Sequence, residues 1–140
     1  MVAEELSQLL HERGMRVTPQ RLVIHRVLRE RGGHLTADDV HDELAATLPG
    51  ISRQTVHSTL ALLAELGVIR RVATPGGTSR YESRTEEHHH TVCESCGALE
   101  DLELRLPVAR AMEHSRATGF SPSSAMMTVL GLCPACAAKR

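Results

Sequence analysis

The four cysteines of this chain form two Cys-x-x-Cys pairs, Cys93 with Cys96 and Cys133 with Cys136, and 36 residues separate the pairs. A turn of this spacing brings two thiolates to the same side of a tight knuckle. Two such knuckles supply the tetrahedral sulfur cage that Zn²⁺ prefers. Zinc bound in this way contributes about 10–16 kcal/mol to the folding of small zinc domains. The pattern therefore predicts a structural zinc site on which the second part of the chain depends to fold.

Two disulfides or two dithiol redox motifs are the alternative interpretations of the same cysteines. The chain has no apolar run long enough to cross a membrane and begins without the features of a secretory signal, so we expect a cytoplasmic protein. Disulfides are rare in that compartment, and the βαβ pattern that surrounds a thioredoxin-like motif is missing. Structural zinc is the favoured interpretation.

Composition and charge limit the possible functions further. The 140 residues suffice for one ordinary domain or two small ones, and aromatic residues make up only 1% of them. Aromatic stacking platforms for single-stranded nucleic acid are therefore excluded. The net charge of −1 gives no global basic field, so any DNA binding must depend on a local patch.

The first 80 residues show helical periodicity interrupted by capping residues and glycines. A first short helix is predicted from Leu6, Leu9 and Leu10 and ends at Gly14. Three more begin at Thr18-Pro19, at Thr36 with Asp39 as a capping box, and at Ser52, and they end near Arg31, Thr47 and Gly67. Two β-prone segments follow at residues 68–74 and 79–82, separated by Pro75-Gly76-Gly77. Helices followed by a hairpin are the order of a winged helix-turn-helix.

The fourth helix has one apolar and one polar face. Val56, Leu60 and Leu63 recur at helical spacing and are expected in the core. The other face carries Arg53, Gln54, His57 and Ser58. Arg suits guanine and Gln suits adenine in the major groove, so this face is the predicted reading edge for DNA. Arginines at positions 16, 21, 70, 71 and 80 are candidates for phosphate contacts, and of these Arg16 and Arg21 are the predicted DNA-binding residues.

The remainder of the chain differs in character. Residues 83–87 are polar and short, which is typical of a hinge. Short strands flank the first knuckle, a helix is predicted from Pro107 to about Thr118, and a strand is predicted from Met126 to Leu132. We therefore predict an α+β protein with a winged-helix domain over residues 1–82, a hinge over 83–87 and a second small domain over 88–140.

A run of three histidines, residues 88–90, precedes the first knuckle among several acidic residues. In an extended segment alternate residues share a face, so His88 and His90 point together and His89 points away. Two imidazoles with carboxylates make a mixed nitrogen and oxygen site suited to Fe²⁺, Mn²⁺, Zn²⁺ or Ni²⁺. A solvated polar loop is the alternative interpretation, but the adjacent knuckle and hinge favour a cluster of ligands.

Five segments, 16–21, 34–39, 52–56, 88–97 and 133–136, together resemble the ferric uptake regulator family of metal-dependent repressors. The resemblance covers almost the whole chain. It implies a winged-helix DNA-binding domain, a hinge and an α/β dimerisation domain. It also implies a homodimer that binds a palindromic operator in double-stranded DNA when its regulatory metal is bound.

The resemblance implies a particular set of ligands for the regulatory metal: His34, Glu82, His88, His90 and Asp101. Asp101 is similar to the ligand of the peroxide-responsive branch. A cysteine near the hinge would suggest a zinc-sensing member, and this sequence has none there. Glu82 differs from the Asp typical of that branch, and Glu100 lies beside Asp101 as an alternative ligand. The resemblance implies an Fe²⁺ or Mn²⁺ site at which peroxide oxidises a histidine ligand and releases the DNA.

Other functions remain as alternatives. Within the same family these are an iron-responsive, nickel-responsive or zinc-responsive uptake regulator. From other classes they are a zinc-binding protein without a DNA role and a zinc-dependent hydrolase or deaminase. His41-Asp42-Glu43 fits the H-x-E element of a deaminase, but neither cysteine pair follows a proline as that enzyme class requires. We therefore expect a protein that is not an enzyme.

Overall fold

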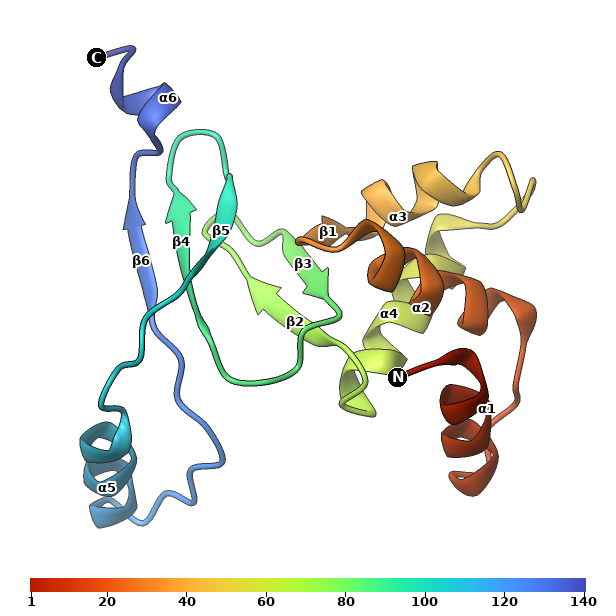
Figure 1. The fold of residues 1–140 in the computed structure, drawn as a ribbon, viewed down its shortest axis with the longest axis horizontal. Coiled ribbons are helices and arrows are strands. Elements are labelled where there is room, and N and C mark those ends of the chain that lie inside the picture. The colour runs from red at the N-terminus through yellow and green to blue at the C-terminus, as the bar shows by residue number, and fades with distance from the viewer. The chain divides into compact units, whose positions relative to one another are not determined.

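The computed structural model describes residues 1–140, which divide into two compact units, Met1–Thr85 and Glu86–Arg140. The division falls inside the polar segment 83–87. Each unit has its own sheet (Figure 1). The elements are those of a mixed α+β protein, as predicted. None of the helices is both long and apolar enough to cross a membrane.

The first unit contains four helices and a small antiparallel sheet. The helices are α1 (Ala3–Glu12), α2 (Pro19–Arg31), α3 (Ala37–Leu44) and α4 (Arg53–Glu65). The strands are β1 (Leu35–Thr36), β2 (Arg70–Ala73) and β3 (Ser79–Glu82), in the order β1-β3-β2. The predicted hairpin is confirmed as β2 and β3, and it follows α4 directly. The two-residue strand β1 was not expected from the sequence.

The helix starts follow from side-chain caps that the sequence predicts. The Thr18 and Ser52 hydroxyls accept hydrogen bonds from backbone N–H groups three residues on, at 3.3 and 3.0 Å. Thr36 and Asp39 form the complete capping box at the start of α3, at 3.1 and 2.9 Å. Helix α3 ends at Leu44, three residues before the predicted end, and turns lead from there to Gly50.

The core of the first unit is aliphatic, as the composition requires. Val56, Leu60 and Leu63 of α4 are fully buried, which confirms the predicted apolar face. They pack with residues of α1, α2, α3 and the sheet, and Tyr81 is the one aromatic side chain among them. This core holds α4 with its polar face outward.

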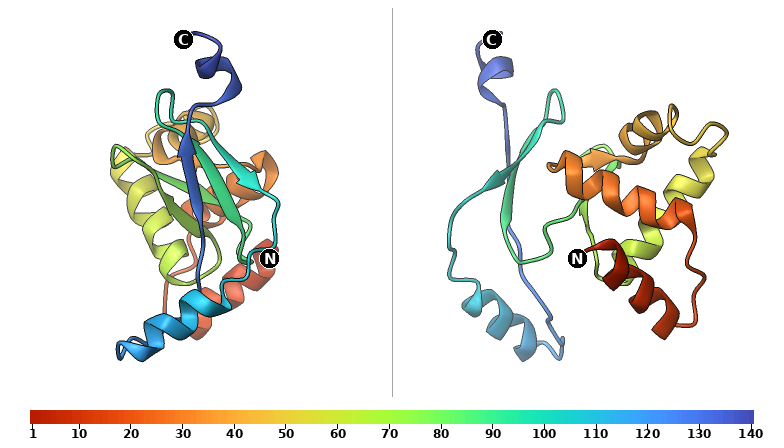
Figure 2. Two further views of the ribbon diagram at one scale, coloured as in Figure 1. Left: turned by 90° about the vertical axis from the view of Figure 1, so that its left-hand side faces the viewer. Right: turned by 45° about the vertical axis from the view of Figure 1, so that its right-hand side comes forward.

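The second unit is built on the sheet β5-β4-β6, with β4 (His89–Cys93), β5 (Leu99–Leu102) and β6 (Thr128–Gly131). Strand β4 pairs antiparallel with β5 and parallel with β6. The parallel pair needs a crossover, which contains α5 (Ala109–Ala117) (Figure 2). Helix α5 begins two residues after the predicted Pro107, and β6 is shorter than predicted because only its centre pairs with β4. A short last helix, α6 (Pro134–Ala137), was not predicted.

Candidate metal centres and nucleic-acid interface

The four cysteines come together at one end of the second unit's sheet. Strand β4 ends at Cys93, opposite Gly131 of the parallel strand β6, so the two knuckles follow neighbouring strand ends. The four sulfur atoms lie within 4.8 Å of one another, and Cys96 and Cys133 have Sγ atoms 3.8 Å apart. None of the four forms a disulfide. The parallel register thus accounts for a cluster that the sequence spacing alone could only suggest.

The electrostatics of this cluster fit a divalent cation. Backbone N–H groups of Cys96 and Cys133 lower the pKa of the Cys93 thiol to about 6. The neighbouring sulfur of Cys133 has the opposite effect on Cys136 and raises its pKa to about 12. The cluster therefore stabilises the thiolate form of Cys93, and a thiolate is the form in which cysteine binds a metal ion. Four clustered thiols are the donor set that a closed zinc site requires.

A second group of candidate ligands lies at the start of β4. Strand pairing places Asp101 of β5 opposite His90. The Nε2 atoms of His88 and His90 lie 3.2 and 3.5 Å from the same Asp101 Oδ1, and the two ring centroids are 4.4 Å apart. His89 points elsewhere, and its Nδ1 accepts a hydrogen bond from the Met127 N–H at 2.9 Å. The predicted alternation along this segment is confirmed.

The hydrogen bonding of His88 suits it to metal binding. Its Nδ1 lies 2.8 Å from the backbone carbonyl of Glu86, which accepts the proton of that nitrogen. The lone pair is then on Nε2, the atom that faces Asp101. A backbone carbonyl behind the imidazole is a common support for a ligand histidine. Glu100, which the sequence left open as a ligand, alternates to the opposite side of β5 and is not in this cluster.

The first unit contributes a histidine and a carboxylate. His34 precedes β1 and Glu82 ends β3, and the antiparallel pairing of Leu35 with Tyr81 makes them neighbours. The His34 Nε2 lies 2.7 Å from Glu82 Oε2, and Arg80 donates to the His34 carbonyl at 3.2 Å. Strand β1 therefore explains how a residue of a glycine-rich loop comes to lie beside the last residue of the hairpin.

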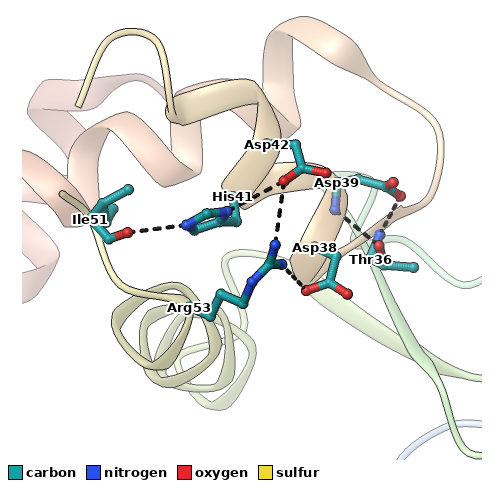
Figure 3. A network of polar contacts seen from close by, with 7 residues as sticks. All are labelled: Thr36, Asp38, Asp39, His41, Asp42, Ile51 and Arg53. Carbon is teal, nitrogen blue, oxygen red and sulfur yellow. Dashed lines mark hydrogen bonds and ion pairs between the residues drawn. The ribbon is translucent and has the colours of Figure 1, made fainter. Parts of the chain in front are cut away.

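The four residues of the predicted reading face differ in what surrounds their side chains. Gln54, His57 and Ser58 of α4 are exposed and line a groove of about 580 Å³ between α4 and the hairpin, together with Arg71. Arg53 is also exposed, but its guanidinium contacts two carboxylates of α3 (Figure 3). Those two residues, Asp38 and Asp42, were not identified from the sequence, although their spacing of four places them on one face of α3.

The arginines proposed for phosphate contacts have partners within the first unit. Arg21 donates to the Arg16 carbonyl at 2.5 Å, which joins the two predicted contact residues at the start of α2. Arg71 donates to the Ser79 hydroxyl at 2.8 Å, and Arg70 donates to the Thr85 carbonyl. The guanidinium groups of Arg21 and Arg71 each have five N–H donors, more than these bonds use.

A helical unit with a strand hairpin, followed by a small sheet unit that carries clustered metal ligands, is the arrangement expected of a metal-responsive regulator with a winged-helix domain. Comparison with known families gives the same answer: residues 12–130 match the model of the ferric uptake regulator family. The chain belongs to the ferric uptake regulator family.

Individual relatives and solved structures agree with this assignment. The chain is 33% identical to the peroxide operon regulator of Bacillus subtilis, over 99% of this chain and 98% of that protein. The fold is similar to that of the Helicobacter pylori ferric uptake regulator, with a TM-score of 0.81, 23% identity and coverage of 96% and 90%. It is also similar to PerR from Streptococcus pyogenes, a protein of peroxide sensing and gene regulation, with a TM-score of 0.55, 26% identity and coverage of 96% and 92%.

Proposed function

We propose that this protein is a metal-dependent transcriptional repressor that binds DNA and responds to peroxide through an Fe²⁺ or Mn²⁺ site. The observation that carries the proposal is the convergence of His88 and His90 on one oxygen of Asp101. Two imidazoles and one carboxylate are the donor set of a site for Fe²⁺ or Mn²⁺. The peroxide operon regulator of Bacillus subtilis, at 33% identity, supports peroxide as the signal.

The regulatory ion would be held by ligands from both units: His34 and Glu82 from the first, and His88, His90 and Asp101 from the second. An ion held in this way restrains the hinge at residues 83–87. The restrained form is the one that presents two reading heads of a homodimer to a palindromic operator. Metal occupancy and DNA affinity are then linked, because the ion favours the conformation that binds DNA.

The four cysteines would hold a structural Zn²⁺ that stabilises the second unit. Their sulfurs are committed to the ion, so they would not be the peroxide sensor. Bound iron would instead supply the redox chemistry by which peroxide oxidises a ligand imidazole. His34, His88 and His90 are the candidates for oxidation. An oxidised ring is a poorer ligand, so the site loses its ion and the protein releases the operator.

The contact with DNA would be made by α4 and the start of α2. Gln54, His57, Ser58 and Arg53 would meet base edges, and Arg16 and Arg21 would meet phosphates. We further propose that the protein acts in the cytoplasm and has no catalytic turnover of its own.

A gel-shift experiment on the full chain tests the proposal. Duplexes selected by the protein from a random pool are titrated with protein loaded with each divalent metal, with and without peroxide. We expect binding that needs Fe²⁺ or Mn²⁺ and that peroxide abolishes only in the iron form. Binding that depends on metal but survives peroxide would instead assign an uptake regulator of the same family. Metal uptake without any DNA binding would leave a zinc-binding protein and overturn the proposal.

Peptide mass spectrometry of the same samples identifies the sensor residue. We expect the mass of one added oxygen on His34, His88 or His90 after peroxide treatment of the iron form. His89 and the exposed His114 serve as internal controls within the same chain. Oxidation spread equally over all five histidines would contradict a sensing site.

A further inference from the structure

Arg53, the first residue of the proposed reading helix, is held by two carboxylates of the preceding helix. Its Nη1 lies 2.5 Å from Asp38 Oδ1 and its Nη2 lies 3.7 Å from Asp42 Oδ1. Figure 3 shows the guanidinium between these two side chains, which project from successive turns of α3. The sequence predicts a DNA contact for Arg53 but no role for either aspartate.

The carboxylates occupy a well-defined position. The capping function at the start of α3 belongs to Thr36 and Asp39, so the neighbouring Asp38 carboxylate is available to Arg53. His41 ties α3 to the chain just before α4, with its Nε2 3.1 Å from the Ile51 carbonyl oxygen, and its Nδ1 lies 3.4 Å from the Asp42 Oδ1 (Figure 3). Buried Val40 and Leu44 fix α3 in the core. The fork of Arg53 is therefore oriented by groups that are themselves held in place.

The location of Asp38 gives this contact a consequence for DNA binding. Asp38 lines the same groove as Gln54, His57 and Ser58. An unpaired carboxylate there would repel phosphates, and an unpaired arginine would attract any phosphate regardless of sequence. Pairing removes both effects. The pair itself is exposed, at 55% and 68% of the two side chains, so it adds little to folding stability.

We propose that Asp38 is a specificity-determining residue that positions Arg53 for a base edge and withholds it from phosphates. This inference rests on the proposed DNA-binding function. The guanidinium has five N–H donors, and the contacts with Asp38 and Asp42 leave enough of them for a two-pronged contact with guanine O6 and N7. Asp42 is the more distant, supporting partner.

The test compares Asp38→Asn with Glu43→Gln in the full, Mn²⁺-loaded chain. Glu43 is a matched control because it lies on the same helix as Asp38, forms an exposed ion pair with Arg31 at 2.6 Å, and loses the same single charge. Affinities are measured over a salt series for the selected duplex and for a scrambled one. For Asp38→Asn we expect tighter binding to the scrambled duplex. We also expect discrimination lowered roughly tenfold and a log–log salt slope steeper by about 0.9, which corresponds to one additional phosphate contact. Glu43→Gln should leave all three unchanged.

Arg53→Ala tests the same contact from the other side and does not depend on how Asp38→Asn folds. We expect it to lower discrimination while leaving the salt slope unchanged, since the paired arginine makes no phosphate contact. Adding Asp38→Asn to Arg53→Ala should have no further effect on the slope. The inference is overturned if Asp38→Asn behaves like Glu43→Gln, or if its steeper salt slope persists without Arg53. A metal-loaded wild-type chain that selects no duplex overturns the proposed function itself, and this inference with it.

Discussion

His25 is a buried imidazole in the first unit that belongs to neither group of candidate ligands. It lies on the core side of α2, is 2% exposed, and has a pKa lowered to about 4. Burial is the main cause, followed by the positive charges of Arg29 and the N-terminus. The ring is therefore neutral at neutral pH and acts as part of the core.

The pH dependence of folding follows from this shift. The unfolded chain takes up a proton at His25 near pH 6.5, whereas the folded chain does so only near pH 4. The free energy of unfolding therefore falls as the pH drops from about 6.5 to 4, by about 3 kcal/mol from this residue. NMR titration of the imidazole in the full chain measures the pKa directly. A midpoint near 6.5 would contradict the prediction, and His25→Asn should reduce the slope of stability in this window.

At the scale of single elements, the capping box of α3 is testable by a pair of substitutions. Thr36→Ala removes the hydroxyl that accepts from Asp39 N–H at 3.1 Å. We expect the free energy of unfolding to fall by about 1 kcal/mol, because one N-terminal N–H of the helix loses its partner. Thr36→Ser keeps the hydroxyl and is the control. Equal losses for both variants, measured by urea denaturation, would show that the methyl group and not the cap is responsible.

The same elements show what the sequence can predict. The four helices of the first unit, their caps and the hairpin all follow from local signals: Thr18, Thr36 and Ser52 begin helices, and Gly67 follows the last of them. The alternation of His88 and His90 is local too. These features need only neighbours within a few residues, which is the range that capping and periodicity report.

The features that the sequence did not predict depend on contacts between distant residues. Strand β1 has only two residues and exists because Leu35 pairs with Tyr81. The exclusion of Glu100 from the ligand cluster follows from the register of β5 against β4. The contact of Arg53 with Asp38 depends on how α3 packs against α4. No local pattern carries this information, because each depends on register or packing.

At the scale of the whole molecule, the two units have different sources of stability. The aliphatic core lies entirely between Leu6 and Tyr81. The second unit has few buried apolar residues, and the four-cysteine cluster joins strand ends that are far apart in sequence. A bound ion there closes a long loop, which restricts the unfolded chain.

Cys96→Ser in the full chain separates these contributions. We expect loss of zinc and of the folded signals of residues 86–140, while the helical signals of residues 1–85 persist. Zinc content and backbone amide NMR measure the two effects. Glu94→Gln, an exposed neighbour in the same knuckle, is the control and should retain zinc. Loss of structure in both units together would contradict separate stabilisation.

Changes at the proposed regulatory site should have the opposite effect to changes at the cysteine cluster: they should alter function without altering the fold. Asp101 and Glu100 are adjacent on β5 but lie on opposite faces, so Asp101→Asn and Glu100→Gln remove one carboxylate each from the two sides of a single strand. Asp101→Asn should weaken Mn²⁺ binding by roughly tenfold or more, since even outer-shell partners of a metal site cost that much. DNA affinity at limiting Mn²⁺ should fall in proportion, because binding of metal and DNA is reciprocal.

Zinc content should be unchanged in both variants, and Glu100→Gln should bind Mn²⁺ and DNA normally. Isothermal titration with Mn²⁺ and anisotropy with the selected duplex measure the two affinities, and an equal loss in both variants would mean that net charge, and not ligation by Asp101, controls the binding of DNA.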